Sequence, residues 1–246
     1  MKTHLFITLI SALFLMYSCK NEKELEEPQI QPENFTDERD GTTYRIVKIG
    51  EQWWMAENLA YLPSVSSVEN ESLNNPVNYV YQYNGTDVNL AKATENYKTY
   101  GVLYNWSAAM TACPEGWHLP TDDEWKQLEL YIGMTQSEVD DRGWRGIAEG
   151  GKLKSLSGWE ENGNGTDDYN FGGLPGGSRE IRSVESSYVY PTRYTDKGHY
   201  GTWWSATEHN NNGEVSVVRV LNNKDGRIIR NPSFNQNGFS VRCVKD

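Results

Sequence analysis

The stretch CPEGWHLPTDDEW (residues 113–125) decides the class of fold. Thr121 followed three residues later by Glu124 has the pattern of a capping box, and the two acidic residues between them suit the positive end of a helix. Trp125, Leu128 and Tyr131 then follow at helical spacing. The stretch therefore predicts a helix that begins after Thr121 and packs one apolar face.

The flanking sequence places other elements around this helix. Helical spacing predicts a helix over residues 103–113, and a second capping box, Thr135 with Glu138, predicts a short one through residue 141. The apolar stretches predict a hairpin over residues 43–49 and 52–55, then strands over 201–205, 214–221, 227–230 and 239–245. Two or three short helices with twisted antiparallel sheets make a loop-rich α+β fold. Residues 62–99 are polar and rich in Asn, and we expect a long excursion with short strands near residues 79–83, which is either functional or mobile.

The composition excludes one class of partner. The chain has 246 residues, of which 23 are Lys or Arg and 34 are Asp or Glu, so the formal net charge is −11. A protein that binds the phosphate backbone of a nucleic acid must neutralise anions with basic side chains. We therefore expect no nucleic acid partner.

The first residues have the pattern of a secretory leader. Lys2 precedes an apolar run over residues 5–16, which is too short for a stable membrane span and ends at Ser18-Cys19. The end of the run resembles a bacterial lipobox, which predicts a signal peptide over residues 1–18 and a lipid on Cys19. The alternative is ordinary cleavage nearby, which leaves Cys19 as a free thiol.

Residues 19–40 are predicted to be an acidic tether. Positions 20–40 hold 3 basic and 8 acidic residues, so this stretch cannot bury enough apolar surface to order itself. Acidic residues after the lipidated cysteine resemble the surface-export signal of Bacteroidetes lipoproteins, which implies a lipid anchor in the outer membrane and a domain at the cell surface. The alternative is a spacer that faces the periplasm. A single domain would then cover residues 41–246.

Three cysteines are an odd number for an exported protein. Lipidation of Cys19 leaves Cys113 and Cys243 as a pair, which an oxidising compartment would join in a disulfide. The alternatives are two free thiols or a metal pair, although the histidines do not have metal-ligand spacing.

Several motifs together resemble the Fibrobacter succinogenes major paralogous domain. In order, they are DGTTY (40–44), WWMAENL (53–59), YGVLYNW (100–106), CPEGWHLPT (113–121), GLPGGSR (173–179), WWSAT (203–207) and GFSVRCVKD (238–246). The resemblance implies an envelope protein of a family whose activity is largely unassigned. The same motifs are more distantly similar to the C-type-lectin-like fold of the sulfatase-modifying enzymes, in which a cysteine of the first helix is joined to the last strand. This implies the Cys113–Cys243 pair as well.

Three residues are candidates for contact with a ligand. Trp54 and Trp204 each belong to a pair of adjacent tryptophans, and adjacent side chains of a strand face opposite sides. One ring of each pair could then stack on a sugar or a protein partner, whereas in the alternative all four rings lie in the core. Arg179 follows a run of glycines and is either a ligand contact or part of a buried charge pair.

The loop NGNGTDD (residues 162–168) is a candidate calcium site. Asn164, Asp167 and Asp168 offer the oxygen ligands that Ca²⁺ takes, but their spacing is not that of an EF-hand. The alternative is a turn without a cofactor.

Taken together, these features predict a cell-envelope lipoprotein with a non-catalytic binding module for a glycan or protein ligand. The first alternative is a structural or accessory subunit of a surface assembly, with residues 62–99 as the contact. The second is an enzyme with an unrecognised site. The chemistry of the sulfatase-modifying enzymes is not expected, because Cys243 is the only C-terminal cysteine and should be bonded; His118 should be a packed residue.

Overall fold

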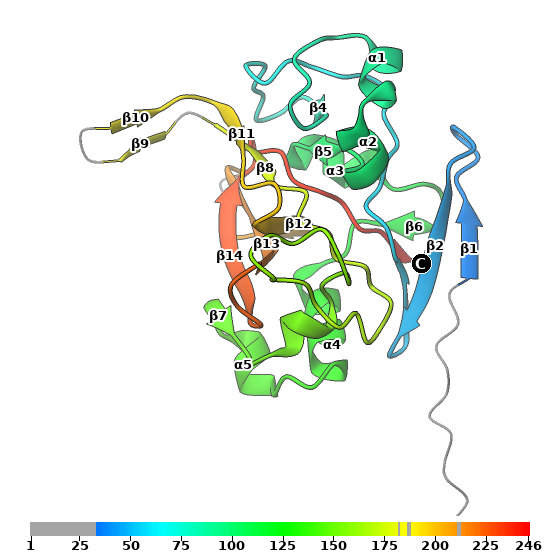
Figure 1. Cartoon of the computed structure of the whole chain (residues 1–246), viewed down its shortest axis with the longest axis vertical. Coiled ribbons are helices and arrows are strands. Elements are labelled where there is room, and N and C mark those ends of the chain that lie inside the picture. The colour runs from blue at the N-terminus through cyan, green and yellow to red at the C-terminus, as the bar shows by residue number, and fades with distance from the viewer. Residues whose placement is uncertain (1–32, 182, 186–187, 211–212) are drawn as a thin grey trace, which may run out of the picture.

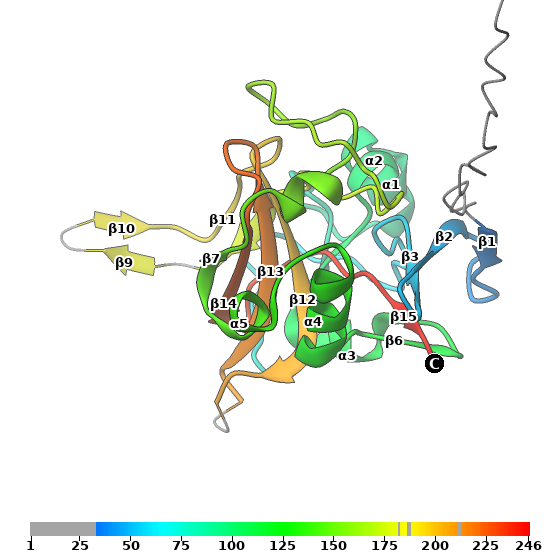
Figure 2. The same ribbon diagram turned by 90° about the horizontal axis from the view of Figure 1, so that it is seen from below.

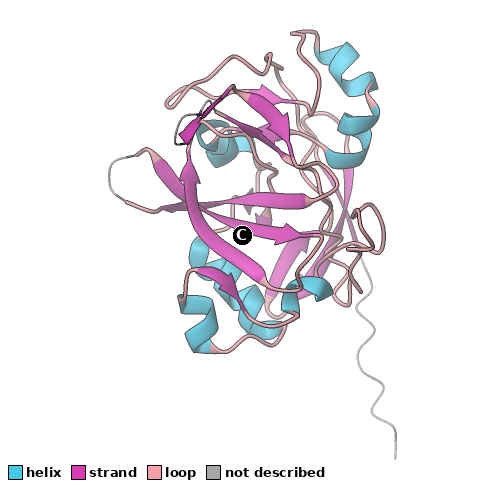
Figure 3. Ribbon diagram, turned by 60° about the vertical axis from the view of Figure 1, so that its left-hand side comes forward, coloured by secondary structure: helices cyan, strands magenta, loops and turns pink. Residues whose placement is uncertain are grey.

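The computed structural model describes residues 33–181, 183–185, 188–210 and 213–246. The fold is α+β and rich in strand, as predicted, with short helices set around antiparallel sheets (Figure 1, Figure 3). The predicted signal peptide, the lipidation site Cys19 and residues 20–32 lie outside the described residues. Within the described part, no helix has the length and apolar character that a membrane span needs.

A five-stranded sheet begins the domain. Its order is β1-β2-β3-β15-β6, with bounds Glu33–Thr36, Thr43–Ile49, Gln52–Met55, Val244–Lys245 and Trp117–His118. The predicted hairpin is confirmed, since β2 pairs antiparallel with β3 and Gly50 supplies the left-handed backbone of the turn (φ +63°). The sheet joins the beginning of the domain to its end, because β15 lies between β3 and β6.

The predicted start of the domain at Gly41 is wrong. Residues 33–36 form β1, which pairs with β2, so residues 33–40 belong to the fold and not to a tether. Asp37 is fully buried, and its carboxylate accepts hydrogen bonds from Arg39. The acidic composition led to the wrong boundary because the carboxylate of Asp37 is not solvated; it is buried and paired with the guanidinium of Arg39, two residues later.

A four-stranded sheet forms the other half. Its order is β12-β13-β14-β7, with bounds Tyr200–Glu208, Val215–Asn222, Ile228–Phe234 and Gly143–Arg145. The first three strands confirm the predictions; β12 and β14 are longer than expected, and β13 is shifted by one residue. The predicted strand over residues 239–245 is confirmed only at β15, because residues 239–243 cross between the sheets and make single bridges, such as Trp203 with Ser240.

Five short α-helices, more than predicted, occur in the described residues. Their bounds are α1 Val88–Ala93, α2 Glu95–Tyr100, α3 Trp106–Ala112, α4 Asp122–Tyr131 and α5 Gln136–Asp140, and a 3₁₀ turn covers Glu149–Lys152. Both predicted capping boxes are present, at Thr121 and Thr135. α3 begins later than predicted because the side chain of Asn105 caps it. The helices α1 and α2 were missed, since residues 62–99 have no long apolar period.

Three two-stranded ribbons complete the fold. β4 pairs with β5, β8 with β11 and β9 with β10, with bounds Asn78–Tyr79, Leu103–Tyr104, Ser178–Glu180, Arg193–Thr195, Ser183–Glu185 and Tyr188–Tyr190. The ribbon β9–β10 projects from the body, whereas β8 and β11 hold its base against the domain (Figure 1, Figure 2).

The core has two parts, one on each side of β12. Trp204 belongs to one apolar cluster with Tyr104 and Phe239, and Trp203 belongs to the other with Trp125. α3 and α4 both pack against β12. The predicted disulfide is present, and it joins Cys113 at the end of α3 to Cys243, 130 residues later.

Candidate functional site

The two tryptophans predicted to contact a ligand are fully buried. Trp54 and Trp204 both have 0% exposure. The indole N–H of Trp204 donates to the carbonyl of Tyr104 at 2.7 Å, and the ring of Trp54 lies 4.8 Å from that of Trp125. The prediction that they stack on a ligand is therefore wrong. Adjacent side chains do face opposite sides of the strand, but Trp203 and Trp204 are both buried in the core and Trp53 is half-buried against it.

Arg179 is also internal, with 0% exposure. Its guanidinium donates to the carbonyls of Val68 and Gln236 at 2.7–3.0 Å and lies 3.5 Å from the carboxylate of Glu71. The predicted ligand contact is contradicted. The alternative of a buried charge pair is confirmed only for Arg179, because the side chain of its partner Glu71 is 37% exposed. Arg179 attaches the polar excursion around Val68 and Glu71 to the body of the domain.

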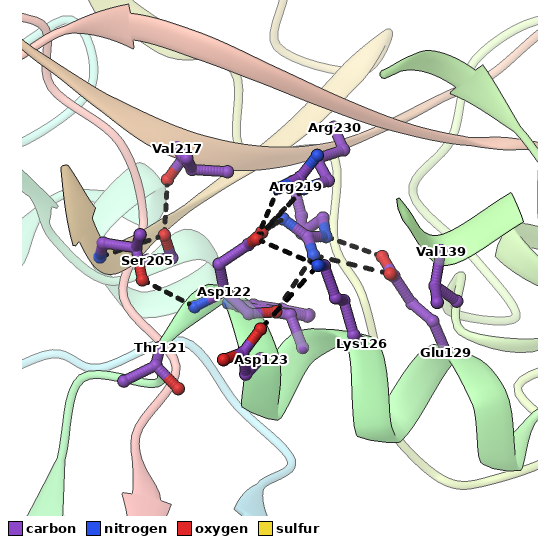
Figure 4. Close-up of polar contacts among 12 residues, drawn as sticks. Thr121, Asp122, Asp123, Lys126, Glu129, Val139, Ser205, Val217, Arg219 and Arg230 are labelled. Atoms are coloured by element: carbon purple, nitrogen blue, oxygen red, sulfur yellow. Dashed lines mark hydrogen bonds and ion pairs between the residues drawn. The ribbon is translucent and has the colours of Figure 1, made fainter. Parts of the chain in front are cut away.

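A cluster of buried charged side chains lies between α4 and the four-stranded sheet. Glu129 of α4 accepts hydrogen bonds from Arg145 and Arg219, while Asp122 accepts from Arg219 and Arg230. Figure 4 shows Arg219 between Asp122 and Glu129. Burial alone would raise the pKa of Asp122, but hydrogen bonds from Arg230 and the charge of Arg219 outweigh it and hold the pKa well below its ordinary value. Each carboxylate in this cluster has guanidinium partners and is closed off from solvent, so the cluster ties α4 to the sheet.

The predicted calcium loop uses two of its oxygens internally. The side-chain oxygen of Asn164 accepts from the amide of Trp159 at 3.0 Å, and Asp167 accepts from the amide of Gly172 at 2.7 Å. Asp168 is exposed. Within the described ranges, no group of three or more His, Cys, Asp or Glu side chains is placed to hold a metal. The three residues are therefore not brought together as a ligand set, and calcium binding stays a prediction.

A polar groove lies beside this loop. Its volume is about 420 Å³, and its walls come from segments far apart in the sequence: the start of β2, the stretch after β3, the end of α2, and the loops near residues 155–157 and 167–174. Its lining includes Arg45, Glu57, Asp167 and Gly172, all on segments that no sequence motif connects. Convergence of polar groups from separate segments in a concave site is typical of a ligand site.

Asp167 is the unusual residue of this groove. Its backbone is in the left-handed region (φ +48°), which costs free energy for a residue with a side chain. Burial raises its pKa, although a hydrogen bond from the amide of Gly172 and the charges of Arg242 and Arg45 oppose this. Other carboxyl groups with a displaced pKa, such as Asp122 and Asp225, are shifted downward. Backbone strain and a perturbed pKa in a cleft both mark functional sites.

The rest of the groove presents unused hydrogen-bonding capacity. Arg45 and Glu57 form an ion pair at 3.4 Å with side chains 50% and 41% exposed, so both are reached by solvent. The hydroxyls of Thr42, Thr99 and Ser157 make no hydrogen bond within the described part of the chain. These donors and acceptors are available to a ligand.

The floor of the groove is rigid. Asn58 is buried, and its side-chain oxygen accepts from Trp203 and Arg242, both at 2.9 Å. Arg242 has 0% exposure and donates to the carbonyls of Phe171 and Gly172. Burial lowers the pKa of Arg242 to about 9, against the charge of Asp167. Gly172 therefore lies between a buried cation below and the groove above.

His118 is a polar residue outside the groove. Its ring nitrogens bond the carboxylates of Glu124 at 2.8 Å and Asp246 at 2.6 Å. It joins the last residue of the sequence to the start of α4, which supports the prediction of a packed histidine.

The comparisons with known proteins place this fold in a family. No curated protein and no solved structure matched the chain. The family model described as the Fibrobacter succinogenes major domain matches residues 47–245, which include both sheets from β3 onward and every segment after residue 46 that lines the groove. The chain therefore belongs to the Fibrobacter succinogenes major domain family.

Proposed function

We propose that the protein is a cell-envelope lipoprotein whose domain is a non-catalytic binding module, with the groove beside Asp167 as its ligand site. The observation that carries the proposal is Asp167 itself, a carboxyl group with raised pKa on a strained backbone in the polar groove. Around it lie hydroxyls that make no hydrogen bond to any described residue and a solvent-accessible ion pair, which suits reversible hydrogen bonding to a ligand.

The cellular location is part of the proposal. The leader and Cys19 support a lipid anchor, and the acidic residues after Cys19 support the outer membrane and the cell surface. Metabolic labelling with a fatty acid, in the wild type and a Cys19→Ala variant, tests the anchor. Protease treatment of intact cells tests the exposure of the domain. A wild-type protein that takes no label would contradict the lipid anchor. A domain that resists protease on intact cells and is cleaved only after lysis would contradict its exposure at the cell surface.

The C-type-lectin-like arrangement also belongs to this proposal. It is supported by the connection between the end of α3 and the segment that leads into the last strand, through Cys113 and Cys243. A solved structure of the protein, compared with C-type-lectin-like domains for strand order and connectivity, tests it. A different order of the strands around β12 would exclude it.

The direct test of the binding function is ligand capture. The full chain is used to capture glycans from an array and proteins from an envelope fraction, beside an Asp167→Asn variant and an Asp168→Asn control. Asp168 is the matched control because it is exposed and does not line the groove. Capture that is lost only with Asp167→Asn supports the proposal. A protein partner that both variants retain would favour the accessory-subunit alternative.

An enzyme is the second candidate, because one observation favours it. The groove holds Asp167, with its raised pKa, and Glu57, which is ion-paired with Arg45. Two carboxyl groups in different environments can divide the roles of acid and base. Prolonged incubation of a captured ligand with the protein, followed by mass spectrometry, decides between the two: new products that Asp167→Asn no longer releases would make the protein an enzyme.

A further inference from the structure

The chemistry of the groove points to one class of ligand, and this inference rests on the proposed function. We propose that the groove binds a neutral saccharide, by holding two neighbouring hydroxyl groups of the sugar between the carboxylate of Asp167 and the guanidinium of Arg45.

The two side chains are placed for this role by Gly172. Asp167 accepts a hydrogen bond from the amide of Gly172 at 2.7 Å. A terminal nitrogen of Arg45 lies 3.6 Å from the position that a Cβ on Gly172 would occupy. That Cβ would also lie 2.9 Å from the carbonyl oxygen of Ala56, and the residue has φ +61°, so no other residue fits without strain. The glycine thus keeps the space between Asp167 and Arg45 free of a side chain.

The balance of charge selects a neutral ligand. Among the residues that line the groove, Arg45 and Lys98 are cations, and Glu57 and Asp167 are carboxyl groups. Arg45 pairs with Glu57, and Lys98 pairs with Glu95 of its own helix at 2.7 Å. An anionic ligand would meet two carboxyl groups, and a cationic ligand would meet two basic side chains. A neutral ligand meets no net charge and carries no ionic group that must be desolvated.

The donors and acceptors match hydroxyl groups. A sugar hydroxyl both donates and accepts, whereas a carboxylate only accepts and a guanidinium only donates. Adjacent hydroxyls can therefore donate to Asp167 and accept from Arg45. The unpartnered hydroxyls of Thr42, Thr99 and Ser157 can do either, at other positions of the same ligand.

The size and the apolar part of the groove fit the same ligand. Its volume of about 420 Å³ lies in the range of pockets for small molecules, which is roughly 300–1,000 Å³. Leu156, which is 68% exposed, and Leu174 also line it. These side chains can cover the C–H face of a sugar ring while the hydroxyls at its edge reach the polar groups.

The test is a binding panel with the full chain at pH 7.5. The probes are neutral glucan, mannan and galactan oligosaccharides, uronate-containing oligosaccharides, and oligosaccharides with free amines. We expect neutral probes to bind. Arg45→Gln and Asp167→Asn should each weaken that binding by roughly tenfold or more, since each removes a charged hydrogen-bond partner.

The controls separate a lost contact from a lost fold. Lys48→Gln on the same strand as Arg45, and Asp168→Asn beside Asp167, should bind like the wild type, because neither residue lines the groove. Thermal unfolding is measured for each variant. Ser157→Ala serves as a second groove variant because Ser157 is exposed, and it should weaken binding several-fold with an unchanged unfolding temperature.

The outcomes also separate this inference from the proposed function. Binding of only the uronate or only the amine probes, lost in Arg45→Gln, would overturn the ligand class and leave the groove as the binding site. Neutral saccharides bound equally by wild type and all groove variants would overturn both. If no probe binds, the assignment of a saccharide ligand is overturned. Capture of proteins from the envelope fraction by the wild type and by Asp167→Asn would then decide the proposed function.

Discussion

The substitution Glu129→Gln tests how the buried charges hold α4 to the four-stranded sheet. Glu129 has 0% exposure and accepts from Arg145 at 2.7 and 2.9 Å and from Arg219 at 2.6 Å. Glutamine keeps the size of the side chain and removes its charge. Arg219 retains the carboxylate of Asp122, but Arg145 has no second carboxylate partner among the described residues and is left with neutral acceptors such as the carbonyl of Val139.

The expected loss of stability follows because Arg219 keeps a carboxylate partner in the variant and Arg145 does not. Removal of one partner from a buried ion pair costs about 3–5 kcal/mol, because the remaining charge is left without compensation in a poorly polarisable site. A typical domain has a free energy of unfolding of about 5–15 kcal/mol, so the variant should lose a large part of its stability. Urea unfolding, followed by tryptophan fluorescence, measures the loss.

Two further variants make the result specific. Glu95→Gln removes one partner of the exposed pair with Lys98 and should cost less than about 1 kcal/mol. The double variant Glu129→Gln with Arg145→Met removes the unpaired charge and should be more stable than Glu129→Gln alone. A loss for Glu129→Gln no larger than that of Glu95→Gln, or no recovery in the double variant, would refute the reasoning.

Four other predictions concern separate features. Replacement of both Cys113 and Cys243 by Ala should lower the free energy of unfolding by about 5 kcal/mol, the chain-entropy value for a loop closed over 130 residues, and a change below about 1 kcal/mol in urea unfolding would contradict it. Thr121→Ala should cost about 1 kcal/mol by loss of the cap of α4, whereas an unchanged urea midpoint would show that the cap is dispensable. Burial alone would lower the pKa of His118, but the hydrogen bonds that its ring donates to the carboxylates of Asp246 and Glu124 outweigh it and raise the pKa. The stability that protonated His118 contributes is therefore complete below the unfolded pKa of about 6.5 and is lost as the pH rises through the folded pKa. His118→Asn should accordingly be more destabilising at pH 5.5 than at pH 8.5, by about 1 kcal/mol or less because the site is partly exposed. A larger destabilisation at pH 8.5 than at pH 5.5 would contradict the raised pKa. The pKa of Asp167 is raised, so protonation of its carboxylate should weaken saccharide binding as the pH falls through that pKa. Titration calorimetry measures the affinity against pH, and the same pH profile in Asp167→Asn would rule out this role of Asp167.

Some elements of the fold were predictable because their signals are local. The caps of α4 and α5 depend on residues three positions apart, and both were found where the sequence placed them. The hairpin of β2 and β3 depends on a short turn at Gly50 between two apolar runs. The helices α1 and α2 were missed because each has six residues and at most one buried side chain, too few for an apolar period.

The candidate site was predictable only in part. Asp167 was singled out because a loop of Asn, Gly and Asp suits a cation, and the structure gives it a different environment. Arg45 and Glu57 have no motif that connects them to Asp167, more than a hundred positions away. The one local hint was Gly172-Gly173, five residues after Asp167, but sequence alone does not say which glycine lies against a groove.

The amino-acid sequence by itself determined the family, the pair of cysteines and the helix caps. The family depends on motifs, the pair of cysteines on a count of residues, and the caps on positions within one helical turn. These features can be predicted without information on which distant segments are in contact. Only the tertiary structure decided that Trp54 and Trp204 lie in the core and that Asp167 lies in a groove. The alternation of a strand says that adjacent side chains face opposite sides, but whether a side is covered depends on segments from elsewhere in the chain, such as α4 and the crossing residues 239–243. Burial is thus a property of the whole packed domain, and so is the groove that its loops leave open.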